Sequence, residues 1–131
     1  MNHYYISKTV DRPFEAVVTD VTARLKEQGF GLLTEIDVQA TLKSKIGAEI
    51  PGYRILGACN PRFAHEALQI EDKLGVLLPC NVIVRETPDH KVEVASIDPV
   101  AAMARTGNPA LRKTAEEVRR LLTNAVSQVG A

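Results

Sequence analysis

The chain of 131 residues contains no tryptophan, has 5% aromatic residues, and carries no net charge, because sixteen acidic residues balance sixteen basic ones. Scarce aromatics disfavour a surface on which nucleic-acid bases stack. Balanced charge without a basic run disfavours binding to a nucleic-acid backbone or to an anionic bilayer. We therefore expect neither a nucleic acid nor a membrane as partner.

Long apolar runs are also absent: none approaches the eighteen or so residues that predict a membrane-spanning helix. The first residues show neither the basic segment nor the apolar segment of a secretory signal, so we expect a cytoplasmic location. In that reducing compartment the two cysteines, Cys59 and Cys80, should be free thiols.

The familiar catalytic motifs are missing as well. There is no glycine-rich phosphate loop, no dinucleotide fingerprint, no Gly-x-Ser-x-Gly and no His-Glu-x-x-His. The sequence therefore indicates no cofactor, assigns no catalytic residue, and does not decide whether the protein is an enzyme.

Apolar residues make up 45% of the chain, which is enough for a hydrophobic core. A chain of this length buries roughly 65–70% of its unfolded surface, so it folds without cross-links. The length fits one domain, and we treat residues 1–131 as a single α+β domain.

Two segments have the three- and four-residue spacing of apolar side chains that is typical of amphipathic helices. The first follows an Asp-Arg-Pro turn and ends near Gly29, and the second covers residues 110–129. A shorter helix should begin after Asp37, a good capping residue. The shorter helices are expected at residues 38–46, 62–70 and 100–104.

Five segments have strand character, at residues 3–10, 30–36, 53–59, 80–86 and 92–97. The last two form a hairpin around a four-residue turn. The order strand, helix, strand, helix, strand, helix, strand, strand, helix predicts one mostly antiparallel sheet. The long first and last helices should pack on one of its faces.

The strand at residues 53–59 is apolar or small on both faces, as in a strand that is covered on both sides. Two long helices cover only one face. The short helices, a second subunit, or both should therefore cover the other face. We favour a homodimer that pairs through a sheet face or a sheet edge.

Four short sequence motifs resemble those of one known family. They are GFG followed by EID at residues 29–37, RILGACNP at 54–61, GVLLPCNV at 75–82, and IDP at 97–99. In this order they resemble the small prokaryotic family called domain of unknown function 302, over nearly the whole chain. The resemblance implies an α+β fold with this order of elements and is consistent with a homodimer. It implies no established reaction, substrate or cofactor.

The dipeptide Cys-Asn occurs twice, as Cys59-Asn60 where a strand gives way to a helix and as Cys80-Asn81 where a strand begins. If these two strands are antiparallel neighbours, both dipeptides lie at one rim of the sheet. Our leading hypothesis is a homodimeric binding or sensing module whose pocket, for a small molecule or a metal, lies at this rim. Glu35 and Asp37 are further candidate ligand-binding residues.

Other interpretations of the same residues stay open. Cys59 before a helix is a candidate reactive thiolate, which would make the protein a thiol-dependent enzyme or redox protein. A cysteine in an apolar strand is most often a small buried core residue, so both cysteines are also explained as core residues, and the whole chain as a structural dimer module. Asn60 is also a natural helix cap, and Asn81 is either a buried hydrogen-bonding residue or a site residue. No metal site is assigned, because the cysteines are far apart and no Cys-x-x-Cys occurs.

Overall fold

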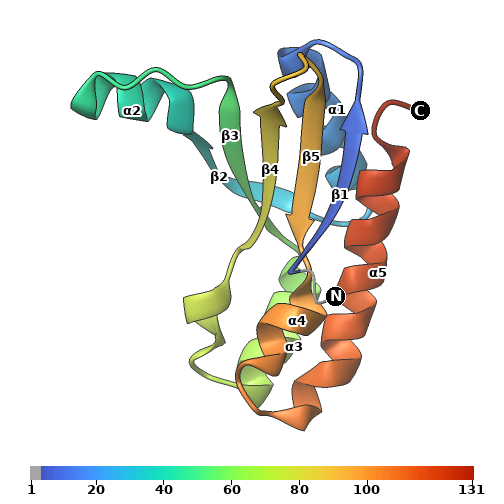
Figure 1. Ribbon diagram of the computed structural model, residues 1–131. Helices are drawn as coiled ribbons and strands as arrows, with labels where there is room; N and C mark the ends of the chain where they lie inside the picture. Colours follow the sequence, from blue (N-terminus) through green and yellow to red (C-terminus); the bar gives the residue numbers. More distant parts are fainter. Residues whose placement is uncertain (1–3) are drawn as a thin grey trace.

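The computed structural model describes residues 4–131, and His3 at the start of the first expected strand lies outside that range. Five strands form one antiparallel sheet in the order β1-β5-β4-β3-β2 (Figure 1), which confirms the predicted α+β architecture. The strands are β1 (Tyr5–Val10), β2 (Gly31–Asp37), β3 (Tyr53–Cys59), β4 (Cys80–Glu86) and β5 (Val92–Ile97).

The helices follow the predicted order. They are α1 (Phe14–Glu27), α2 (Val38–Ile46), α3 (Pro61–Ile70), α4 (Pro99–Ala104) and α5 (Arg112–Gln128), with single 3-10 turns η1 (Leu74–Leu77) and η2 (Pro109–Leu111). The long helices α1 and α5 contact each other and the same face of the sheet, as expected. None of the helices in residues 4–131 is both long enough and apolar enough to cross a bilayer.

In the part of the chain that the structure describes, the buried apolar residues form two clusters. The larger cluster lies between the sheet and the two long helices, where Leu25, Val94 and Leu122 are fully buried. Strand alternation builds it, because every second side chain of β4 and β5 faces the helices. The smaller cluster lies between α3, η1, α4 and the start of α5, around Leu74 and Leu111.

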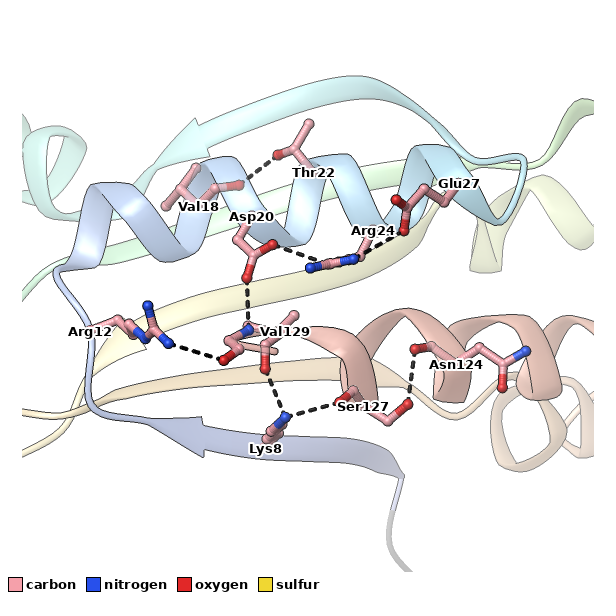
Figure 2. A network of polar contacts seen from close by, with 11 residues as sticks. Lys8, Arg12, Val18, Asp20, Thr22, Arg24, Glu27, Asn124, Ser127 and Val129 are labelled. Atoms are coloured by element: carbon pink, nitrogen blue, oxygen red, sulfur yellow. Dashed lines mark hydrogen bonds and ion pairs between the residues drawn. The ribbon is translucent and has the colours of Figure 1, made fainter.

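Hydrogen bonds connect the end of α5 to β1, to α1 and to the turn between them (Figure 2). Lys8 Nζ donates to the carbonyl oxygen of Val129 at 2.7 Å, and Arg12 donates to that of Gly130 at 3.2 Å. The amide of Gly130 in turn donates to Asp20 Oδ2 at 2.7 Å. Cations at a helix C-terminus satisfy its free carbonyl groups and complement its dipole, so these contacts stabilise the last turn of α5.

The short helices do not cover the second face of the sheet. Helices α3 and α4 pack against α5, while α2 extends beyond the β2–β3 side of the sheet (Figure 1). Asp37 caps α2 as predicted, by accepting from the amide of Ala40 at 2.9 Å. The helix ends at Gly47, whose φ of +68° suits glycine. Within residues 4–131, the face opposite α1 and α5 therefore stays open.

Candidate functional site

The rim where β3 ends and β4 begins brings the two cysteines together. Strands β3 and β4 are antiparallel neighbours, and their register sets Ala58 opposite Cys80 and Gly57 opposite Asn81. Cys59, Asn60 and Cys80 all line one cavity of about 350 Å³. The antiparallel pairing of β3 and β4, expected from the sequence, thus brings these three residues to one cavity.

The cavity lies between the two hydrophobic clusters. Phe30, Ala58 and Val118 contribute to its wall from the larger cluster, and Ala67 and Met103 from the smaller one. The side chains that complete the lining are those of Leu33, Phe63, Ala64, Leu68, Leu78, Pro79 and Thr114, together with Gly75. None of these residues is charged, so the wall is apolar except for two thiols, one amide and one hydroxyl group.

Cys80 is both a core residue and part of the cavity wall. Its side chain is 8% exposed and belongs to the larger cluster. Burial, and secondarily the neighbouring Cys59 sulfur, raise the pKa of the Cys80 thiol from 9.0 to about 11. Cys80 is therefore a neutral thiol at physiological pH. Cys59 is half-buried at the end of β3, two residues before α3.

Asn60 stands at the N-cap position of α3, but its side chain makes no capping hydrogen bond. Instead Nδ2 donates to the carbonyl oxygen of Gln28, after the end of α1, at 3.4 Å. Asn60 therefore occupies the predicted N-cap position, but its side chain does not make the hydrogen bond of a helix cap. Gly29 allows this approach, because a Cβ there would lie 3.1 Å from Nδ2 and its φ is +90°. Asn60 Oδ1 accepts no hydrogen bond within residues 4–131 and remains available to a ligand.

Thr114, on α5, is the second neutral polar side chain of the wall. It is 4% exposed, and its hydroxyl group donates to Glu66 Oε1 at 2.8 Å. No sequence pattern singles out Thr114, or Phe63 and Met103, which also line the cavity. Their apolar spacing predicts burial alone, and nothing in a local pattern distinguishes a packed side chain from one that borders a cavity.

Asn81 lies away from this cavity. Successive residues of a strand point to opposite faces, so a buried Cys80 sends Asn81 to the open face, where it is exposed. It borders a separate hollow of about 580 Å³ together with Tyr53, Ile83 and Ile97. The reading of Asn81 as a buried hydrogen-bonding residue is therefore wrong.

Glu35 and Asp37 gather around Arg54 instead of the cysteines. Arg54 Nη1 lies 2.8 Å from Glu35 Oε2, and Nη2 lies 3.0 Å from Glu15 Oε2 and 3.8 Å from Asp37 Oδ2. The Glu35 hydrogen bond is the main cause that raises the pKa of Arg54. Because β2 and β3 are antiparallel, Gly31 is paired with Cys59, and Asp37 with Arg54 toward the other end of β3. Within residues 4–131, no three His, Cys, Asp or Glu side chains are grouped to hold a metal ion.

The protein is of the α+β class: two long helices pack on one face of a five-stranded antiparallel sheet, and a cavity lies at the rim of that sheet. Its sequence matches the model of the family described as domain of unknown function DUF302 over residues 6–129, and the chain belongs to that family. The fold is shared with the crystal structure of an uncharacterized conserved protein DUF302 from Bacillus stearothermophilus. That match has a TM-score of 0.92 and 22% identity, and it covers 98% of this chain and 99% of the other. Comparison with curated proteins gives no match.

Proposed function

We propose that the chain is a binding module whose small-molecule ligand occupies the cavity at Cys59, Asn60 and Cys80. The observation that carries the proposal is the cavity itself, about 350 Å³ in volume, with an apolar wall and a few neutral polar groups. Small-molecule sites in proteins typically have this size and this mixture of apolar wall and isolated polar groups.

The chemistry of the wall favours an uncharged ligand. A charge placed among apolar side chains without a partner is costly to desolvate, and among residues 4–131 no charged side chain lines the cavity. A metal ion is less favoured, because metals bind thiolate and burial keeps Cys80 in its thiol form. The ligand we expect is compact and apolar, with one hydrogen-bond donor directed at Asn60 Oδ1.

The position of the cavity gives the ligand a measurable effect on stability. A molecule in it contacts both hydrophobic clusters, and therefore holds α3 and α4 against the sheet. A ligand that binds only the folded state stabilises it by about 2.7 kcal/mol when its concentration is a hundred times its Kd. Binding should thus raise the melting temperature.

N-phenyl-1-naphthylamine is a suitable probe, because it is neutral and apolar and carries one N–H donor. Its sulfonated analogue, 8-anilinonaphthalene-1-sulfonate, has the same rings and a negative charge. We expect the neutral probe to fluoresce and to raise the melting temperature, and the anionic one to bind more weakly. Preference for the anionic probe would contradict an uncharged site.

A cavity-filling variant locates the binding. Ala64 lines the cavity from α3, so Ala64→Phe should abolish the naphthylamine signal. The matched control is Ala23→Phe, at an exposed position of α1 outside the cavity. Equal binding by both variants and the parent protein would place the probe elsewhere and refute the proposed site.

Thiol chemistry at Cys59 is the second candidate, because this half-buried residue borders the same cavity and lies two residues before α3. A helix N-terminus favours a thiolate. The pH dependence of iodoacetamide labelling tests it: an apparent pKa clearly below the ordinary ~8.5 supports a reactive thiol, and an ordinary value speaks against it.

A further inference from the structure

The open face of the sheet carries an apolar row that runs straight across neighbouring strands. The strand registers place Ile36 beside Ile55, Ile55 beside Ile83, and Ile83 beside Ala95. The row therefore crosses β2, β3, β4 and β5 at one level. Ile36 is 46% exposed, Ile55 and Ile83 are half-buried, and the small Ala95 is 8% exposed.

Helix α2, which lies beyond the β2–β3 side of the sheet, also has an exposed apolar side. It starts right after β2, and its Val38, Leu42 and Ile46 recur every four residues, which puts them on one side of the helix. No residue of α2 is buried, and Ile46 is 74% exposed. A helix of nine residues is marginal in water without a packing partner. Val38 and Leu42 are half-buried and α2 contacts β3, so its apolar side is covered only in part, and Ile46 stays exposed.

The charges on this face favour a second copy of the chain over a charged partner. In the central strands the face carries one cation and one anion, Arg85 and Glu93, paired at 2.7 Å. A nucleic acid or an anionic membrane would require an excess of positive charge. In a twofold contact, identical surfaces meet, so Arg85 can approach the partner's Glu93 and the reverse. The face is thus complementary in charge to itself.

The size of the surface suits a modest dimer. Five strands spaced about 4.8 Å apart and about six residues long offer a face of roughly 20 Å by 20 Å. The nine residues of α2 add a strip about 14 Å long. Two such surfaces together approach about 1,000 Å², the lower limit for a specific interface.

We propose that the open face, defined by the row Ile36, Ile55, Ile83 and Ala95 and by the apolar side of α2, pairs with the same face of a second copy. This face lies opposite the one on which α1 and α5 pack, and the proposal does not depend on ligand binding in the cavity. The two sheets would pack face to face, each about 10 Å from the other. The pairing would also cover the exposed part of the apolar side of α2.

Sedimentation velocity of the full chain over a range of concentrations tests the pairing. We expect a dimer that dissociates on dilution. Ile36→Lys, at an exposed position that does not endanger folding, should weaken it about tenfold or more, because the contact would desolvate a lysine charge among apolar side chains. Val76→Lys is the matched control, since Val76 is 86% exposed on η1 and away from the face, and it should leave the dimer unchanged.

Ile46→Lys on α2 and Ile83→Lys at the centre of the row give two further readings. Both should weaken the dimer, with circular dichroism showing that the fold is retained. A wild-type monomer at about 100 µM, a concentration at which a specific interface of this size should be populated, overturns the proposal. Dimers unaffected by both Ile36→Lys and Ile46→Lys overturn it as well. Naphthylamine binding by the Ile36→Lys protein should remain as in wild type, which separates this test from that of the cavity.

Discussion

Alkaline pH should destabilise the protein through Cys80. Burial raises the pKa of this thiol from 9.0 to about 11 in the folded state. Below pH 9 the thiol is protonated in both the folded and unfolded states, and its ionisation has no effect. Between pH 9 and pH 11 the unfolded chain loses this proton while the folded protein keeps it. The stability associated with the raised pKa is thus intact below pH 9 and is lost as the pH approaches 11.

The magnitude follows from the size of the shift. Two pH units at about 1.4 kcal/mol each give roughly 2.7 kcal/mol, most of it reached by pH 11. This is a substantial part of the 5–15 kcal/mol that typically separates folded and unfolded states. Because Cys80 is only 8% exposed, solvent screening reduces the value little.

Urea unfolding followed by circular dichroism, at pH 8, 9, 10 and 11, measures the effect. The comparison is between wild type and Cys80→Ala, since all other titrating groups are common to both. The alanine variant leaves a small void, which should lower its free energy of unfolding by a constant amount at every pH. The advantage of wild type should shrink by about 2 kcal/mol between pH 9 and pH 11. A difference that stays constant over this range would refute the raised pKa and, with it, the neutral cavity wall.

Three further substitutions test how the fold supports the site, each read as the free energy of unfolding. Gly57→Ala should cost about 1–3 kcal/mol, because its Cβ would lie 2.2 Å from Thr34 Oγ1, whereas Gly31→Ala meets nothing within 4 Å and should be tolerated; equal effects would contradict the close packing. Asp98→Ala should cost about 1–2 kcal/mol by uncapping α4, and Asp98→Asn should cost less because it keeps an acceptor. Lys8→Met should cost about 1 kcal/mol by freeing the last carbonyl groups of α5, and no loss would mean that water replaces this contact fully.

The site shows where reasoning from sequence succeeded. Neighbouring antiparallel strands predicted that Cys59 and Cys80 would meet, and both line the same cavity. The same rule, applied further, separates the remaining candidates. Alternation along β4 sends Asn81 to the other face, and the antiparallel run of β2 carries Glu35 away from Cys59 toward Arg54.

Other features needed the packed structure. Asn60 has the sequence context of a helix cap, yet its amide reaches the carbonyl oxygen of Gln28, because the end of α1 comes close in space. The choice between these two hydrogen bonds depends on a contact between residues 32 positions apart. No local preference encodes that distance.

By itself, the sequence determined the helices, the strands and the antiparallel sheet, because apolar spacing, turns and caps such as Asp37 act over a few neighbouring residues. Tertiary structure alone decided that a cavity remains beside Cys80 and that the row through Ile36 stays open. A cavity forms where side chains from several distant segments fail to fill the space between them, and a face stays open where no helix reaches it. Both depend on how whole elements are placed, which the periodicity of one segment does not specify.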